Sequence, residues 1–224
     1  KTINMPASKL EYTKKLISND NSNGDILCVT NADIINYLHS QFSMPLEEHF
    51  LDYVNDVISI SDLICNDSKK YFKYRLYHTN YNRSTWGIKQ KFIDKGIEDY
   101  LDKSQMSFYD RISECRLAII VYGQNTTLYE TLSANFPTLI FWNPDHWELR
   151  ADAKPYFELL IRAGIYHTSV QSLCNKINRV YEDVDGWWSS EEIQKNIKIF
   201  CNQYAMTSDN YTVQWTEELK KHIT

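Results

Sequence analysis

The chain alternates short apolar runs with longer stretches in which apolar residues recur every three or four positions. The short runs are rich in Ile, Val, Leu and Phe, and most of them predict strands buried in a parallel sheet. We expect strands at residues 25–30, 71–77, 97–101, 117–122, 138–142 and 165–168. The helical pattern at residues 86–93 is followed by Gly96, which predicts a left-handed helix end. Because helical patterns separate the strands, we expect an α/β fold, a Rossmann-like parallel sheet with helices on both faces.

The clearest unit lies at residues 113–144. Residues 117–121 are all apolar and form the first strand, which Tyr122 and Gly123 end. Apolar residues then recur with helical spacing at residues 128–136, and a second apolar strand follows. This unit therefore predicts a right-handed crossover between two parallel strands.

The turn of this unit is a candidate phosphate site. Gly123 would let a ligand approach the backbone closely, and the first N–H groups of the helix attract anions beside the hydroxyls of Thr126 and Thr127. Glu130 lies one turn later, where its carboxylate would accept hydrogen bonds from ribose hydroxyls. The alternative is a capping box, in which Thr127 and Glu130 satisfy the helix backbone.

Other polar residues follow strand ends and belong to the same edge of the sheet. The loop at residues 31–44 brings His39 and Ser43 to this edge. Arg75 and His78 lie at or near the end of the second expected strand, and Arg75 can bind a phosphate through two parallel hydrogen bonds. The alternatives are a solvated His39 and an Arg75 that pairs with a carboxylate.

A further group of candidates follows the strand that ends at Trp142. Asp145 is placed to cap a helix that carries His146 and Arg150. His146 would face a bound ligand, and Arg150 would reach its phosphate or carboxylate. The alternative is that Arg150 pairs with Glu148 on the helix surface.

The pattern also divides the chain into three parts. Residues 1–24 end in a polar run and predict a linker, residues 25–185 form the Rossmann-like domain, and residues 186–224 form C-terminal helices. The last helix is expected at residues 211–221. Its expected buried residues are Val213, Trp215 and Leu219.

Composition narrows the classes of function. The net charge of −5 argues against nucleic acid as a partner. No apolar run approaches the roughly 20 residues of a transmembrane helix. The five cysteines are scattered, which argues against a zinc site or disulfides and favours buried thiols in a cytoplasmic protein. The sequence has neither the glycine-rich dinucleotide fingerprint nor the Walker A loop, and nothing in it resembles an Asp-x-Asp metal site.

Three motifs carry a resemblance to known families. Thr127-x-x-Glu130, followed by six residues and Pro137, is similar to the donor-site pattern of GT-B glycosyltransferases. The stretches TTLYETLSANFPT and FWNPDHWELR resemble a family of bacterial transferases from surface-polysaccharide loci. The tail motifs GWWSSEEIQ and YAMTSDNY also fit that family, in which Pro replaces His78. The similarity is dense from about Ser113 to Trp215 and weak before it.

The resemblance implies the nucleotide-sugar-binding lobe of a GT-B enzyme, with a glycan or lipid-linked acceptor held by a missing N-terminal lobe. It implies that Thr127 faces the diphosphate and Glu130 binds the ribose, without a metal or another cofactor. The catalytic base would come from the other lobe, with His78 and His146 as candidates in this chain. Since the first residue is Lys rather than Met, we expect a piece of a longer protein that transfers nothing alone. Other hypotheses are a non-catalytic module that binds a glycan or protein, and a different nucleoside-phosphate enzyme.

Overall fold

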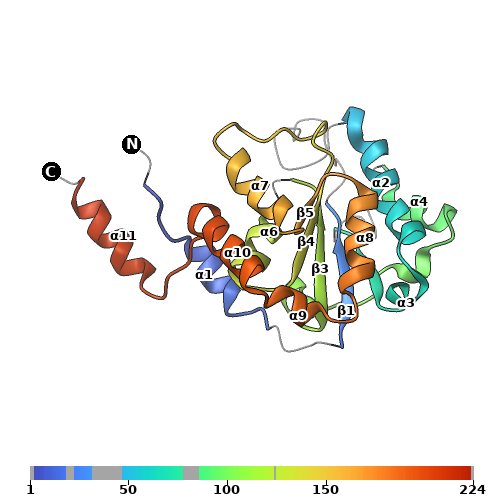
Figure 1. Ribbon diagram of the computed structural model, residues 1–224, viewed down its shortest axis with the longest axis horizontal. Helices are drawn as coiled ribbons and strands as arrows, with labels where there is room; N and C mark the ends of the chain where they lie inside the picture. Colours follow the sequence, from blue (N-terminus) through green and yellow to red (C-terminus); the bar gives the residue numbers. More distant parts are fainter. Residues whose placement is uncertain (1–2, 19–22, 32–46, 78–85, 124, 223–224) are drawn as a thin grey trace.

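The computed structural model describes residues 3–18, 23–31, 47–77, 86–123 and 125–222 (Figure 1). These residues form one five-stranded sheet in the order β2-β1-β3-β4-β5, and every pairing is parallel. The predicted α/β class and Rossmann-like parallel sheet are confirmed. The strands are β1 (Asp25–Val29), β2 (Phe72–Arg75), β3 (Cys115–Val121), β4 (Thr138–Phe141) and β5 (Tyr166–His167).

Strand β3 shows why the apolar runs predict the sheet correctly. All its residues are buried, and successive side chains point to opposite faces, so that Leu117 and Ile119 join one core while Ala118 and Ile120 join the other. β1 and β4 flank β3 on its two sides, and β2 and β5 lie outside them, so β1, β3 and β4 are the inner strands.

Helices cover both faces of the sheet (Figure 1). One core contains residues of α2, α4 and α8, and the other contains residues of α5, α6, α7 and α10. The helices are α1 (Ser8–Lys14), α2 (Phe50–Leu63), α3 (Asn66–Lys69), α4 (Ile88–Asp94), α5 (Phe108–Ser113), α6 (Thr126–Ser133), α7 (Lys154–Arg162), α8 (Val170–Val180), α9 (Val184–Trp188), α10 (Glu191–Tyr204) and α11 (Tyr211–Lys220), with the 3-10 turns η2 (Glu47–His49) and η4 (Glu98–Tyr100).

The strand predicted at residues 97–101 is wrong. Gly96 has φ +73° and ends α4 as expected, but the chain then turns through η4 and pairs with β2 through a single bridge between Tyr74 and Leu101. Ile97 and Leu101 are both buried, so two apolar residues four positions apart anchor a helical turn here. Such spacing fits a turn as well as a strand, and the sequence pattern does not separate the two.

The helix predicted after Asp145 is also absent, because residues 145–153 form turns and irregular backbone. The Asn143 side chain accepts a hydrogen bond from the Asp145 N–H at 3.0 Å, which favours a turn of the backbone. Regular helix resumes at α7, which carries Pro155 in its first turn.

The N-terminal helix packs on the body of the domain, whereas the C-terminal helix does not. Helix α1 lies within the segment expected to be a linker, and it packs against α6 with Leu10 buried. Helix α11 projects away from the body (Figure 1) and buries none of its residues. The burial predicted for Val213, Trp215 and Leu219 is therefore wrong, since they are 55%, 41% and 52% exposed. Among the described residues, no helix combines the length and apolar character that a membrane crossing requires.

Candidate functional site

A cavity of about 940 Å³ lies at the carboxyl ends of β1 and β2. Its wall includes the strand ends, the turn after η4 and the first residues of α5 and α6. Among the lining residues are Thr30, Arg75, Asp102, Met106, Asn125 and Thr127.

The strand order explains why the cavity forms at this place. From β1 the chain passes to β2 on one side, and it then crosses to β3 on the other side of β1. The connections on the two sides of such a switch point diverge, which leaves a crevice beyond the carboxyl ends of the strands. The start of α6, directly after β3, borders this crevice.

Helix α6 is capped by Asn125, whose side-chain oxygen accepts a hydrogen bond from the Thr127 N–H at 3.0 Å. Asn125 therefore takes the position that the capping-box alternative gave to Thr127. Asn125 and Thr127 both line the cavity, whereas the exposed Thr126 is not among the lining residues.

Glu130 is 4% exposed and takes part in contacts away from the cavity. Its carboxylate lies 3.0 Å from the Lys9 ammonium of α1 and accepts a hydrogen bond from the Tyr109 hydroxyl at 3.2 Å. Burial of the Tyr109 phenol, together with this carboxylate, raises its pKa to about 12. Glu130 thus joins α1 and α5 to α6, and it is not among the residues that line the cavity.

Arg75 is the last residue of β2, and its side chain lines the cavity at 18% exposure. Its Nη1 donates to the Asp102 carboxylate at 2.7 Å, and its Nη2 donates to the Met106 carbonyl at 2.7 Å. The carboxylate-paired alternative for Arg75 is therefore present. The ion pair with Asp102 nevertheless keeps the Arg75 side chain at the cavity wall.

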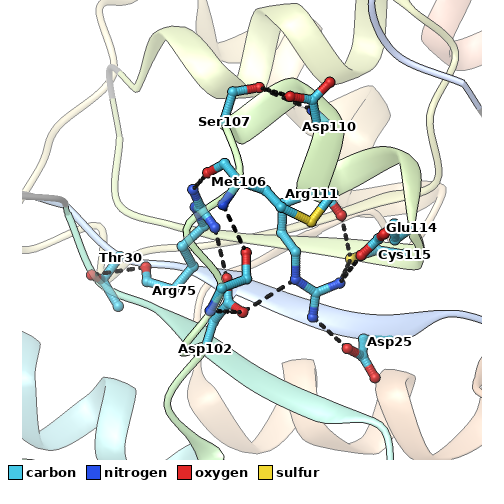
Figure 2. Close-up of polar contacts among 11 residues, drawn as sticks. Asp25, Thr30, Arg75, Asp102, Met106, Ser107, Asp110, Arg111, Glu114 and Cys115 are labelled. Carbon is cyan, nitrogen blue, oxygen red and sulfur yellow. Dashed lines mark hydrogen bonds and ion pairs between the residues drawn. The ribbon is translucent and has the colours of Figure 1, made fainter.

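The Asp102 carboxylate belongs to a longer ionic network, shown in Figure 2. Its Oδ1 accepts a hydrogen bond from Nε of Arg111 at 3.2 Å, and Nη2 of Arg111 donates to Asp25. Sequence reasoning missed Asp102 and Arg111. The sequence did contain one signal, because Arg111 lies next to the apolar Ile112 on a short helix. An arginine that is buried at such a position needs a carboxylate partner.

The carboxyl ends of β3 and β4 are filled instead of hollow. A Cβ atom added to Gly123 would lie 2.6 Å from the Trp147 ring, so the close approach that glycine permits is made by this indole. Tyr122 has φ +137°, a conformation that costs free energy for a residue with a side chain. The Tyr122 ring contacts Trp147 with a centroid distance of 5.8 Å.

His146 also belongs to this filled half. Its ring stacks on His49 with a centroid distance of 4.4 Å, and its Nε2 lies 3.8 Å from the Asp52 carboxylate. The side chain is 9% exposed. Arg150 is 85% exposed and pairs with Asp152 on the surface. The structure thus separates His146 and Arg150 from the cavity that contains Arg75 and Thr127.

Three candidates, His39, Ser43 and His78, lie outside the described residues. Within the described residues, no group of three or more His, Cys, Asp or Glu side chains is arranged to hold a metal ion.

The parallel sheet with its cavity at the strand switch point defines a Rossmann-like α/β protein. The family model named LIC12162 family transferase matches residues 1–219, and the chain therefore belongs to this family. The name of the family identifies the protein as a transferase. A search of curated proteins finds no match to the chain.

Proposed function

We propose that this chain is the donor-binding lobe of a GT-B-type glycosyltransferase that uses a nucleotide-activated sugar in bacterial surface-polysaccharide biosynthesis. The observation that carries the proposal is the joint position of Arg75 and the start of α6 at one cavity beside the strand switch point. Ligands of open α/β sheets bind at such a crevice. The family name supports the coarser part of the proposal, which is group transfer.

The diphosphate of the donor would lie between Arg75 and Thr127. The guanidinium supplies paired donors for phosphate oxygens, while Thr127 and the start of α6, the positive end of the helix dipole, line the same cavity. Lys103 adds a cation to the cavity wall. These groups would also stabilise the charge that develops on the departing phosphate, which is an electrostatic contribution to catalysis.

The base and ribose would occupy the apolar part of the same cavity. Leu76, Ile93 and Met106 line that part and offer surface for a base. Glu130 contacts the ribose in this proposal only if the ligand displaces Lys9, because Lys9 and Tyr109 now contact its carboxylate.

The catalytic base would come from a second lobe. No histidine is among the described residues that line the cavity, and His146 lies in the filled half. Orientation of donor and acceptor by two closed lobes contributes up to roughly 7–11 kcal/mol to catalysis. We therefore expect this chain to bind a nucleotide weakly and to transfer no sugar, with His39, His78 and His146 as the first residues to mutate if transfer occurs.

The test is calorimetric titration of UDP-, CMP-, GDP- and TDP-sugars into the protein and into two matched variants. Arg75→Met removes one cation from the cavity wall, and Arg150→Met removes a surface cation elsewhere. We expect one donor series to bind, with about a tenfold loss for Arg75→Met, equivalent to one charge-assisted hydrogen bond, and no loss for Arg150→Met. Absence of binding by every donor would contradict the proposal and favour a non-catalytic module.

A further inference from the structure

Part of the Arg75 guanidinium is hydrogen-bonded to the protein, and the side chain also lines the cavity. Two of its N–H groups bond to Asp102 and to the Met106 carbonyl. A guanidinium has five N–H donors, so among the described residues Arg75 keeps further donors for a ligand in the cavity that it lines.

Asp102 is fixed more firmly than an ordinary partner of a surface arginine. It is 5% exposed, and its backbone N–H donates to the Tyr74 carbonyl at 2.8 Å. Its Oδ1 accepts from Arg111 at 3.2 Å and from the Ser104 N–H at 3.3 Å, which leaves Oδ2 directed at Arg75. Because both oxygens are engaged, the carboxylate has one orientation, and that orientation fixes the guanidinium.

Arg111 anchors the other end of this arrangement. Its side chain is 6% exposed and bonds to Asp25, the first residue of β1, as well as to Asp102. Burial raises the pKa of the adjacent Cys115 thiol to about 12, so the thiol stays neutral at ordinary pH. Asp25, Arg111, Asp102 and Arg75 therefore form an alternating row of charges from the start of β1 to the end of β2 (Figure 2).

Only one end of this row of charges, the end with Arg75, reaches the cavity. Arg111 does not line the cavity, whereas Asp102 and Arg75 do. If the row of charges only stabilised the domain, the remaining N–H donors of the Arg75 guanidinium at the cavity would have no role. A preset guanidinium, by contrast, binds a phosphate without first losing its own rotamer freedom.

We infer that Asp102 is a positioning residue, which holds Arg75 so that the remaining N–H groups of the guanidinium bind a phosphate group of the donor. The inference deepens the proposed function and rests on it for the identity of the donor. The ligand chemistry that it assigns to Arg75 is a diphosphate.

The experiment is a double-mutant cycle on Arg75 and Asp102, read by calorimetry with two probes. The probes are inorganic pyrophosphate and the nucleoside diphosphates UDP, CDP, GDP and TDP. Asp102→Asn keeps the size of the side chain but removes its charge. We expect it to weaken diphosphate binding about tenfold in the native protein, in line with one charge-assisted hydrogen bond. In the Arg75→Met background it should have no further effect, because its role acts through Arg75.

A purely structural role would lower the melting temperature without this coupling in affinity. Equal losses in both backgrounds, or unchanged affinity in folded Asp102→Asn, would overturn the inference. If Asp102→Asn does not fold, Arg75→Lys tests the same point, because lysine keeps the charge but cannot contact Asp102 and a phosphate with one planar group. Diphosphate affinity within twofold of the native value in Arg75→Lys would then overturn it.

The two probes separate this inference from the proposed function. Coupled binding of pyrophosphate without any preference for a nucleotide would support the inference and contradict the nucleotide-sugar site. Nucleotide binding that is independent of both residues would support the site and overturn the inference. Absence of binding by both probes would contradict both.

Discussion

The carboxyl edge of the sheet has two halves, one hollow beyond its strands and the other filled. Beyond β1 and β2 there is a cavity of about 940 Å³, with Arg75 and Thr127 in its wall. Beyond β3 and β4, the space next to His146 is about 10 Å³, which is at the limit for one water molecule. Trp147 fills the approach to Gly123 on this side. The comparison shows that a polar residue at a strand end does not by itself mark a site, because other side chains can fill the space beyond the strand.

The largest expected effect concerns His167, which ends β5 on the filled side and is 6% exposed. Its Nε2 lies 3.2 Å from the Gly164 carbonyl, and its Nδ1 lies 2.8 Å from the Ser172 hydroxyl. Burial, with a smaller contribution from Lys176, lowers the pKa of His167 from 6.5 to about 4. The unfolded chain therefore binds a proton in this range that the folded protein does not bind.

Stability should consequently fall as the pH drops from 6.5 to 4, by about 3 kcal/mol for this group. Well above pH 6.5 the imidazole is neutral in both states, and its contribution approaches zero. The measurement is urea unfolding of the native protein and of His167→Gln across this range. The variant should show a smaller loss on acidification. Parallel curves for the two proteins would contradict the buried neutral imidazole.

The next effect tests the packing of the filled half directly. Gly123→Ala places a Cβ atom 2.6 Å from the Trp147 ring, so the ring must shift, at a cost of about 2 kcal/mol. Urea unfolding gives the free energy. The control is Gly123→Ala combined with Trp147→Leu, in which the alanine should cost much less than it does beside the indole. An equal cost in both backgrounds would show that Trp147 is not what requires glycine.

A smaller effect is expected in the open half. Thr127→Val keeps the shape of the side chain but removes the hydroxyl at the cavity wall. Loss of the one hydrogen bond that this hydroxyl donates to a phosphate oxygen should weaken diphosphate binding about threefold. Thr126→Val is the matched control, because Thr126 is exposed and is not among the lining residues. Equal losses in the two variants, measured by calorimetry, would contradict the position of the phosphate at Thr127.

The smallest effect is expected for a substitution in the filled half. His146→Gln should leave diphosphate affinity within a factor of two, because the imidazole stacks on His49 in the filled half. Titration with the same nucleotides measures this. A large loss would show that the filled half opens when a ligand binds.

The sequence predicted the sheet well because a strand that is buried on both faces is a continuous apolar run in the sequence. The runs at 25–30, 117–122 and 138–142 are apolar for the same reason that they lie inside the sheet. Gly96 likewise predicted its own backbone conformation, with φ +73°. The exposure of Trp215 was not predictable in this way, because the apolar pattern of α11 does not say whether another element covers it.

The candidate site was only partly predictable. Arg75 was found because it lies near the end of an expected strand, and Thr127 because it lies at the start of the helix expected after another strand. Asp102 and Arg111 were missed, since an ion pair between separate loops and helices leaves no periodic signal. The contact between Lys9 and Glu130 is of the same kind, because it depends on how α1 packs against α6.

The hydrogen bond from the Trp215 indole to the Pro6 carbonyl, 2.7 Å long, has a consequence for the order of folding. It joins residues 209 positions apart, so nearly the whole chain must be looped before it forms. The entropy of closing a loop grows with its length, and α11 buries no side chain that would offset this cost early. The two ends should therefore dock last, after the parallel sheet has assembled. They should also open first, so that the amide hydrogens of α11 exchange with solvent faster than those of α10.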